Sequence, residues 1–170
     1  MRFALVAAMI GLLFSSSAQA GLPSCATDSE RHAMLVRGLQ SYLMMAGVAC
    51  NQGDAYNKFV TRNQSELSTQ GHALKAYFQR VYGGNSERRL NDFITEIANA
   101  WSQVHLTNMA NYCKSTWEMM YLLEKNPQPL VEVSKGISAQ PGVTAVMCNG
   151  VGGTADTRVA SAQAPAARSR

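Results

Sequence analysis

The sequence lacks every short motif that would point to a common enzymatic chemistry. It contains no H-E-x-x-H metal site, no G-x-S-x-G nucleophile turn and no Walker phosphate loop. It also has no C-x-x-C pair, which excludes a thioredoxin-type redox site and haem attachment through C-x-x-C-H. The glycine cluster at residues 150–153 has no lysine and precedes no predicted helix, so we interpret it as a linker. We therefore predict a protein that is not an enzyme and carries no cofactor.

The folded part of the chain has little net charge. The whole chain carries 15 basic and 11 acidic residues, but several of them lie near its two ends. Without Arg2, Arg158, Arg168 and Arg170, and without Asp156, these counts become 11 and 10. Proteins that bind nucleic acid usually concentrate basic residues on one face. We therefore predict that nucleic acid is not a partner.

Long hydrophobic runs are confined to the N-terminus. Residues 3–14 form an uncharged apolar stretch, and Ala18-Gln19-Ala20 matches the A-x-A cleavage pattern. A membrane-spanning helix needs about 20 apolar residues, so we predict a cleaved signal peptide over 1–20 and no spanning helix. Residues 21–149 then form one helical domain, and residues 150–170, rich in Ala, Gly, Ser and Pro, form a disordered tail. We expect the mature protein in the periplasm or outside the cell.

Helical periodicity dominates the domain. A T-x-x-E capping box at Thr27 opens a first helix that continues to about residue 49, with an apolar stripe on one face. A second helix follows over 54–82 with apolar residues at seven-residue intervals, and a third over 86–125 is long enough for a kink near 107–108. Two prolines end it, a short helix covers 130–135, and 143–148 forms an extended strap. The predicted fold is all-α: a disulfide-stapled, up-down-up helical bundle with a C-terminal return segment.

Four cysteines, Cys25, Cys50, Cys113 and Cys148, follow the predicted signal. In an exported chain they predict two structural disulfides. Cys25 and Cys50 flank the first helix and would lie roughly 30 Å apart, whereas a disulfide needs Cα atoms within about 7 Å, so this pair is excluded. Three helices running up, down and up favour Cys50/Cys113 with Cys25/Cys148. The alternative is Cys25/Cys113 with Cys50/Cys148.

Two groups of side chains are candidates for binding. Met44, Met45, Met119 and Met120 fall near one end of the predicted bundle, and exported copper proteins use thioether ligands. Core packing is the competing interpretation, because no M-x-x-M or adjacent histidine supports a metal site. The domain also holds more aromatic residues than one narrow core stripe requires, which predicts an exposed interface. The interface candidates are Tyr82, Arg88, Arg89, Trp117 and Tyr121.

Four stretches of the sequence are considered together: residues 39–46 with the following Cys50-Asn51, residues 56–60, residues 87–93, and Tyr112-Cys113. Together these stretches resemble a group of small exported bacterial helical proteins of unknown function. The resemblance spans roughly residues 25–115, implies that Cys50 and Cys113 pair, and carries no active site across. The chain is also similar in size, export and lack of catalytic motifs to the small cofactor-free subunit of periplasmic quinohaemoprotein alcohol dehydrogenases.

These observations predict a non-catalytic periplasmic or secreted protein that binds a protein partner. A small stabilising subunit of a periplasmic oxidoreductase complex is one such accessory role. The alternative is a periplasmic protein that binds a small ligand or copper in a pocket between helices.

Overall fold

The all-α fold predicted from the sequence is confirmed. A computed structural model describes residues 24–137, 140–143 and 145–148, so the predicted signal peptide (1–20) and tail (150–170) lie outside the described residues. No helix of the described part is long and apolar enough to cross a membrane. The elements are α1 (Asp28–Ala49), α2 (Gly53–Arg62), α3 (Gln64–Tyr82), the 3-10 turn η1 (Gly83–Asn85), α4 (Ser86–Thr107), α5 (Met109–Lys125) and α6 (Leu130–Lys135).

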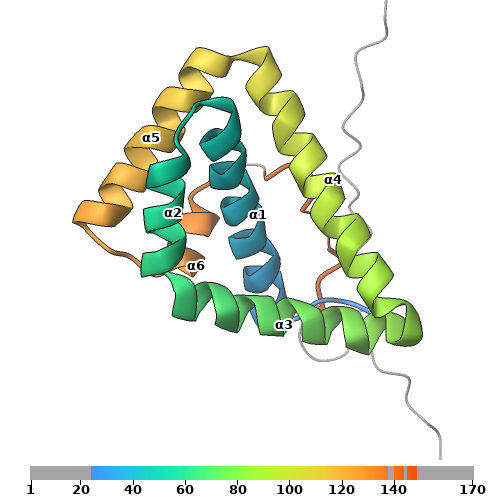
Figure 1. The fold of residues 1–170 in the computed structure, drawn as a ribbon. Coiled ribbons are helices and arrows are strands. Elements are labelled where there is room, and N and C mark those ends of the chain that lie inside the picture. Colours follow the sequence, from blue (N-terminus) through green and yellow to red (C-terminus); the bar gives the residue numbers. More distant parts are fainter. Residues whose placement is uncertain (1–23, 138–139, 144, 149–170) are drawn as a thin grey trace, which may run out of the picture.

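The first helix, α1, is the centre of the molecule. Figure 1 shows α3, α4 and α5 as three sides of a triangle around it, with α2 lying between α1 and α5 in this view. Each of the other α-helices contacts α1, and it is buried on nearly every face, with Met34, Val36, Leu39 and Leu43 almost fully inaccessible. We expected a single apolar stripe on this helix. Because polar residues are few between 33 and 46, the helix can instead be enclosed on most sides.

Two breaks divide the long helices that the sequence predicted. The predicted second helix is not continuous: α2 ends at Arg62 and α3 begins at Gln64, with the Asn63 side-chain amide donating to the carbonyl oxygen of Phe59 at 2.8 Å. A short polar side chain that bonds the backbone in this way competes with the helical hydrogen bonds. The predicted third helix breaks at Asn108, whose backbone is non-helical and whose side chain caps α5. The kink expected near 107–108 is therefore a complete break.

Both disulfides have the pairing favoured from the sequence. Cys50 is bonded to Cys113 with their Cα atoms 5.5 Å apart, which joins the end of α1 to α5. Cys25 is bonded to Cys148 with their Cα atoms 5.0 Å apart, which joins the segment before α1 to the return segment. The alternative pairing is therefore wrong.

The return segment is an extended strap, as predicted. The amide of Ala26 donates to the carbonyl of Val146 at 2.7 Å, and the amide of Cys148 donates to the carbonyl of Ala26 at 2.9 Å. The turn that leads into the strap places Gly142 at a φ of 77°, and a Cβ atom there would lie 3.1 Å from the Cα atom of Ile97 in α4. Glycine is required at this turn for both reasons.

Candidate functional site

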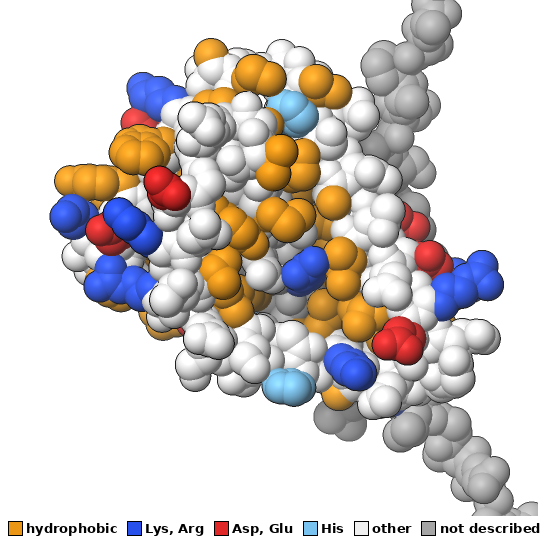
Figure 2. Space-filling view, viewed as in Figure 1, with side chains coloured by type: hydrophobic (Ala, Val, Ile, Leu, Met, Phe, Trp, Pro, Cys, Tyr) orange, Lys and Arg blue, Asp and Glu red, His pale blue; other side chains and the backbone are white. Residues whose placement is uncertain are grey.

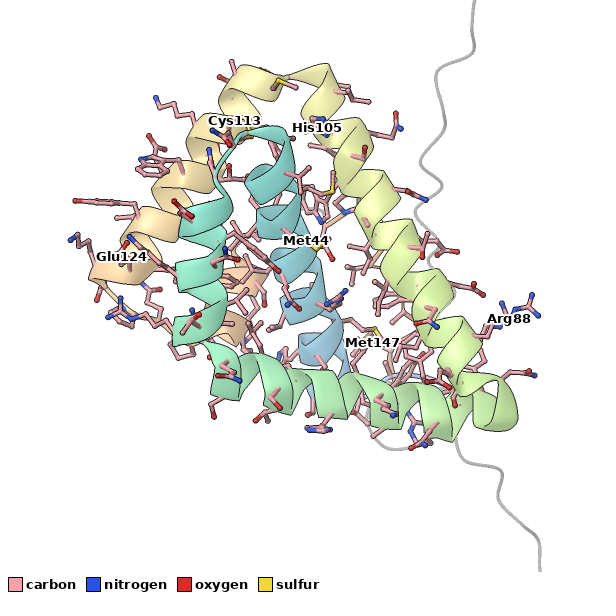
Figure 3. All side chains as sticks on the ribbon, in the orientation of Figure 1. Met44, Arg88, His105, Cys113, Glu124 and Met147 are labelled. Carbon is pink, nitrogen blue, oxygen red and sulfur yellow. A yellow bond between two sulfur atoms is a disulfide. The ribbon has the colours of Figure 1, made fainter. Side chains whose placement is uncertain are left out.

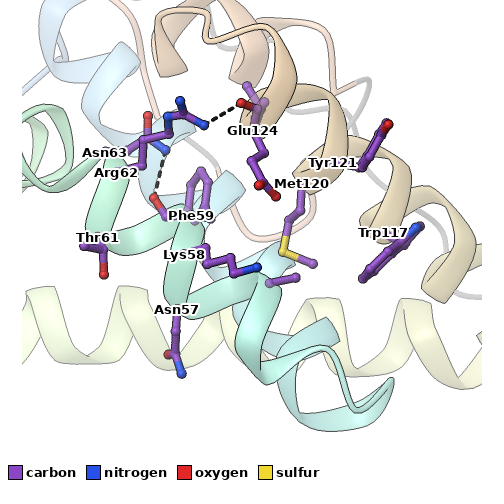
Figure 4. Close-up of a pocket in the computed structure, with 12 residues that line it drawn as sticks. Asn57, Lys58, Phe59, Thr61, Arg62, Asn63, Trp117, Met120, Tyr121 and Glu124 are labelled. Atoms are coloured by element: carbon purple, nitrogen blue, oxygen red, sulfur yellow. Dashed lines mark hydrogen bonds between the residues drawn. The ribbon is translucent and has the colours of Figure 1, made fainter.

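A groove lies between α2 and α5, the pair of helices at one edge of the molecule (Figure 4). Its cavity volume is about 480 Å³, within the range of sites that bind ligands or peptide side chains. We call it the α2/α5 groove. The residues that line it are Ala55, Asn57, Lys58, Phe59, Thr61, Arg62, Asn63, Trp117, Met120, Tyr121, Leu123 and Glu124.

Polar contacts fix the two helices at both ends of the groove. At one end the Gln52 side chain, which directly precedes α2, donates to the carbonyl of Cys113 at 2.7 Å and accepts from the Thr116 hydroxyl at 3.1 Å. At the other end the Arg62 guanidinium donates to the carbonyl of Glu124. The disulfide between α1 and α5 lies beside the first of these contacts. The groove is therefore held in shape by the fold before any ligand binds.

The floor of the groove is apolar, and two exposed aromatic side chains stand beside it. Phe59, Met120 and Leu123 are buried, whereas Trp117 is 54% exposed and Tyr121 is 50% exposed. These two aromatics are four residues apart, so they share one face of α5. Large exposed aromatic side chains next to an apolar floor are typical of protein interfaces.

The rim of the groove carries more positive than negative charge. Lys58 and Arg62 come from α2, and the Nζ atom of Lys125 lies 5.7 Å from the centre of the Tyr121 ring. The hydrogen bond of Arg62 reaches a backbone carbonyl, so its charge is not matched by a carboxylate there. Glu124 supplies the carboxylate among the lining residues. Figure 2 shows basic, acidic and hydrophobic side chains mixed along the α5 edge. Among the residues that line the groove, the two basic side chains of α2 outnumber the one carboxylate.

The other predicted interface residues lie at the corner between α3 and α4. The Tyr82 ring stacks on Phe78 with centroids 5.6 Å apart, and the Arg89 guanidinium lies 5.7 Å from the centre of the Tyr82 ring. Arg88 is exposed at the start of α4 and points away from the body (Figure 3). The structure therefore separates the five candidates into two places, α5 and the α3/α4 corner, on different edges of the triangle (Figure 1).

The four methionines considered as copper ligands lie on α1 and α5. Met120 belongs to the core, and Met45 and Met119 pack against it. Met44 is half-buried on α1 (Figure 3). Hydrophobic packing accounts for Met45, Met119 and Met120. Among the described residues, no group of three or more His, Cys, Asp or Glu side chains is placed to hold a metal ion.

A buried aromatic cluster braces the helices beneath the break between α4 and α5. The Tyr112 hydroxyl donates to the carbonyl of Tyr42 at 2.5 Å, and the Tyr42 ring lies 4.6 Å from Trp101 and 5.1 Å from Tyr112. The His105 ring is buried 5.9 Å from that of Tyr112. Burial, with the nearby Tyr42, raises the pKa of the Tyr112 hydroxyl. This cluster joins α1, α4 and α5 and supports the structure around the disulfide.

The sequence predicted Trp117 and Tyr121 as interface residues, but it did not predict the residues that α2 contributes to the α2/α5 groove. Lys58, Phe59 and Arg62 become one wall only because the chain turns at Asn63, and the seven-residue periodicity gave no sign of that turn. A usable signal was present in the spacing of Lys58 and Arg62, which places both charges on one helical face. Comparisons with protein-family models, curated proteins and solved structures found no match to this chain.

Proposed function

We propose that this protein is a non-catalytic accessory protein that binds a protein partner through the α2/α5 groove. The observation that carries the proposal is the exposure of Trp117 and Tyr121 beside an apolar floor, on helices that a disulfide and polar contacts hold in place. Tryptophan and tyrosine dominate the energetics of known interfaces because they bury a large area for little lost side-chain freedom. A rigid groove also limits the conformational entropy that binding removes.

The chemistry of the groove indicates the kind of segment that it binds. Its apolar floor suits an amphipathic helix that inserts hydrophobic side chains between α2 and α5. The rim residues Lys58 and Arg62 favour acidic residues flanking that hydrophobic face. We therefore propose a partner with an exposed acidic, amphipathic segment.

The compartment belongs to the same proposal. Two disulfides are compatible with an oxidising location outside the cytoplasm. We place the mature protein in the periplasm or in the secreted fraction, on the strength of the predicted signal peptide. The similarity in character to the small subunit of quinohaemoprotein alcohol dehydrogenases makes a periplasmic oxidoreductase complex the first partner to examine.

The test is affinity purification of the mature protein from its native cell envelope under non-reducing conditions. Trp117→Ala and Tyr121→Ala are compared with the wild type and with Leu106→Ala, which removes a side chain that is 63% exposed on α4. We expect one protein to be enriched with the wild type and with Leu106→Ala, and to be depleted with both groove variants. Equal recovery with all four proteins would rule out the α2/α5 groove as the docking site.

A further inference from the structure

A second groove opens on the face shown in Figure 2, between α1 and the surrounding helices. Its cavity volume is about 340 Å³, and it receives residues from α1, α2, α3 and α4. Figure 2 shows hydrophobic side chains gathered around a basic one in this part of the surface. We call it the Arg37 groove. Its apolar walls are Val36, Val60, Leu67, Leu74, Leu90 and Ile94.

Arg37 of α1 is half-buried in this apolar setting without a carboxylate partner. Its Nη1 atom donates to the side-chain oxygen of Gln40 at 2.8 Å, and its Nε atom is buried with no hydrogen-bond partner. Within the described residues, no acidic side chain lies within ion-pair distance of it. A charged guanidinium that is desolvated and only partly hydrogen-bonded costs folding free energy.

Arg80, a second part-buried arginine, has a carboxylate partner. Arg80 of α3 makes two hydrogen bonds to the carboxylate of Glu30, at 2.6 and 3.0 Å, and a third to the carbonyl of Cys25 at 2.9 Å. Arg80 therefore has the carboxylate that Arg37 lacks. Because the Nε atom of Arg37 is buried, an external anion would bind the remaining Nη hydrogens of this partly exposed side chain, for which no carboxylate partner is present among the described residues.

We propose that the Arg37 groove binds an amphipathic anion with a straight aliphatic chain. The guanidinium of Arg37 binds the head group, because its planar donors match the paired oxygens of a carboxylate or a phosphate. The aliphatic chain lies against the walls contributed by α2, α3 and α4, where Leu67, Leu90 and Ile94 are partly exposed and can bury apolar surface on binding. A medium-chain fatty acid and an alkyl phosphate share this chemistry. This site is independent of the α2/α5 groove.

The experiment is calorimetric titration of the mature, disulfide-intact protein with four probes that each carry a ten-carbon chain, the ionic ones kept below their micelle concentrations and the alcohol below its solubility limit. The probes are decanoate, decyl phosphate, decanol and decyltrimethylammonium. We expect the two anions to bind at least tenfold more tightly than decanol, and the cation more weakly still, because only the anions can accept charge-assisted hydrogen bonds from the guanidinium. The ratio between decanoate and decyl phosphate then distinguishes a carboxylate from a phosphate head group. Octanoate should bind less tightly than decanoate, by about fourfold for each lost methylene.

Two variants and a matched control connect binding to this groove. Arg37→Met should weaken decanoate binding at least tenfold and leave decanol binding unchanged. Ser68→Trp places a large ring at an exposed α3 position in the groove lining and should weaken decanoate and decanol alike. Arg31→Met changes an exposed arginine on the same helix and should bind decanoate as the wild type does.

Three results would overturn the proposal. The first is the absence of decanoate binding to the wild type at millimolar concentration. The second is equal affinity of decanoate for the wild type and Arg37→Met. The third is an unchanged decanoate affinity in Ser68→Trp, which remains informative if Arg37→Met does not fold.

Discussion

Arg37→Met should stabilise the protein, although it removes a charged residue from the central helix. The buried, unpartnered Nε donor costs about 1 to 3 kcal/mol, and its removal recovers that free energy. The substitution also removes the 2.8 Å hydrogen bond from Arg37 to Gln40, which contributes about 1 kcal/mol. Methionine fills the space with an apolar chain of nearly the same helix propensity. The net expected gain is about 1 kcal/mol, or a rise in Tm of about 2 to 4 °C.

The measurement is urea-induced unfolding followed by circular dichroism, with both disulfides intact. Arg31→Met is the control, because it makes the same substitution at an exposed position of α1 and should change the free energy of unfolding by less than about 0.5 kcal/mol. Destabilisation by Arg37→Met of more than about 1 kcal/mol would refute the reasoning, since it would mean that the guanidinium makes stabilising contacts in the unliganded protein. Stabilisation combined with loss of ligand binding is the pattern expected of a residue retained for binding.

Three further predictions concern the framework that shapes the two grooves. Gly142→Ala should destabilise the protein by about 1 to 3 kcal/mol in the same assay, because its φ of 77° and the nearby α4 backbone both disfavour a Cβ atom; an unchanged midpoint would contradict this. Replacing Cys50 and Cys113 by alanine should cost about 4 kcal/mol for their 63-residue separation, and a loss below about 1 kcal/mol would show that the bond does not constrain the unfolded chain. Burial opposes ionisation of Glu30, but hydrogen bonds from Arg80 and a backbone amide outweigh it and hold the pKa of Glu30 below its usual value. The stabilisation that the ionised Glu30 gives the folded protein is therefore present at neutral pH and is lost as the pH falls through that lowered pKa. The difference in unfolding free energy between the wild type and Glu30→Gln should shrink on acidification. A constant difference from pH 7 to about 3 would contradict this prediction.

Local signals in the sequence predicted the start of the first helix and the bounds of the short helix at 130–135. The capping box at Thr27 is formed as expected, with Glu30 and Thr27 each bonding the backbone amide of the other. The short helix at 130–135 has the predicted bounds, because the prolines before it act through backbone geometry alone. Helix length excluded a Cys25/Cys50 bond, because the rise per residue is fixed, and the expected up-down-up order of the helices favoured the observed pairing over the alternative.

The arrangement of the helices could not be predicted from the hydrophobic periodicity of the sequence. A seven-residue apolar interval passes through Asn63 without interruption, but the Asn63 side chain bonds the backbone of Phe59 and the chain turns there. The enclosure of α1 depends on helices far along the chain, so a single stripe was expected where several faces are buried. Arg37 was overlooked for the same reason: a lone arginine on an amphipathic surface helix is ordinary, whereas on a central helix it is not.

The most direct test of the proposed function is site-specific photocrosslinking in the native envelope. A photoreactive phenylalanine analogue replaces Tyr121 in the α2/α5 groove, Tyr82 at the α3/α4 corner, or Leu106 on α4, all of which are exposed. We predict that position 121 crosslinks to one partner protein through an acidic, amphipathic segment, and that position 106 does not. Crosslinking to the same partner from position 82 with none from position 121 would contradict the account, because it would place the docking surface at the opposite edge of the molecule.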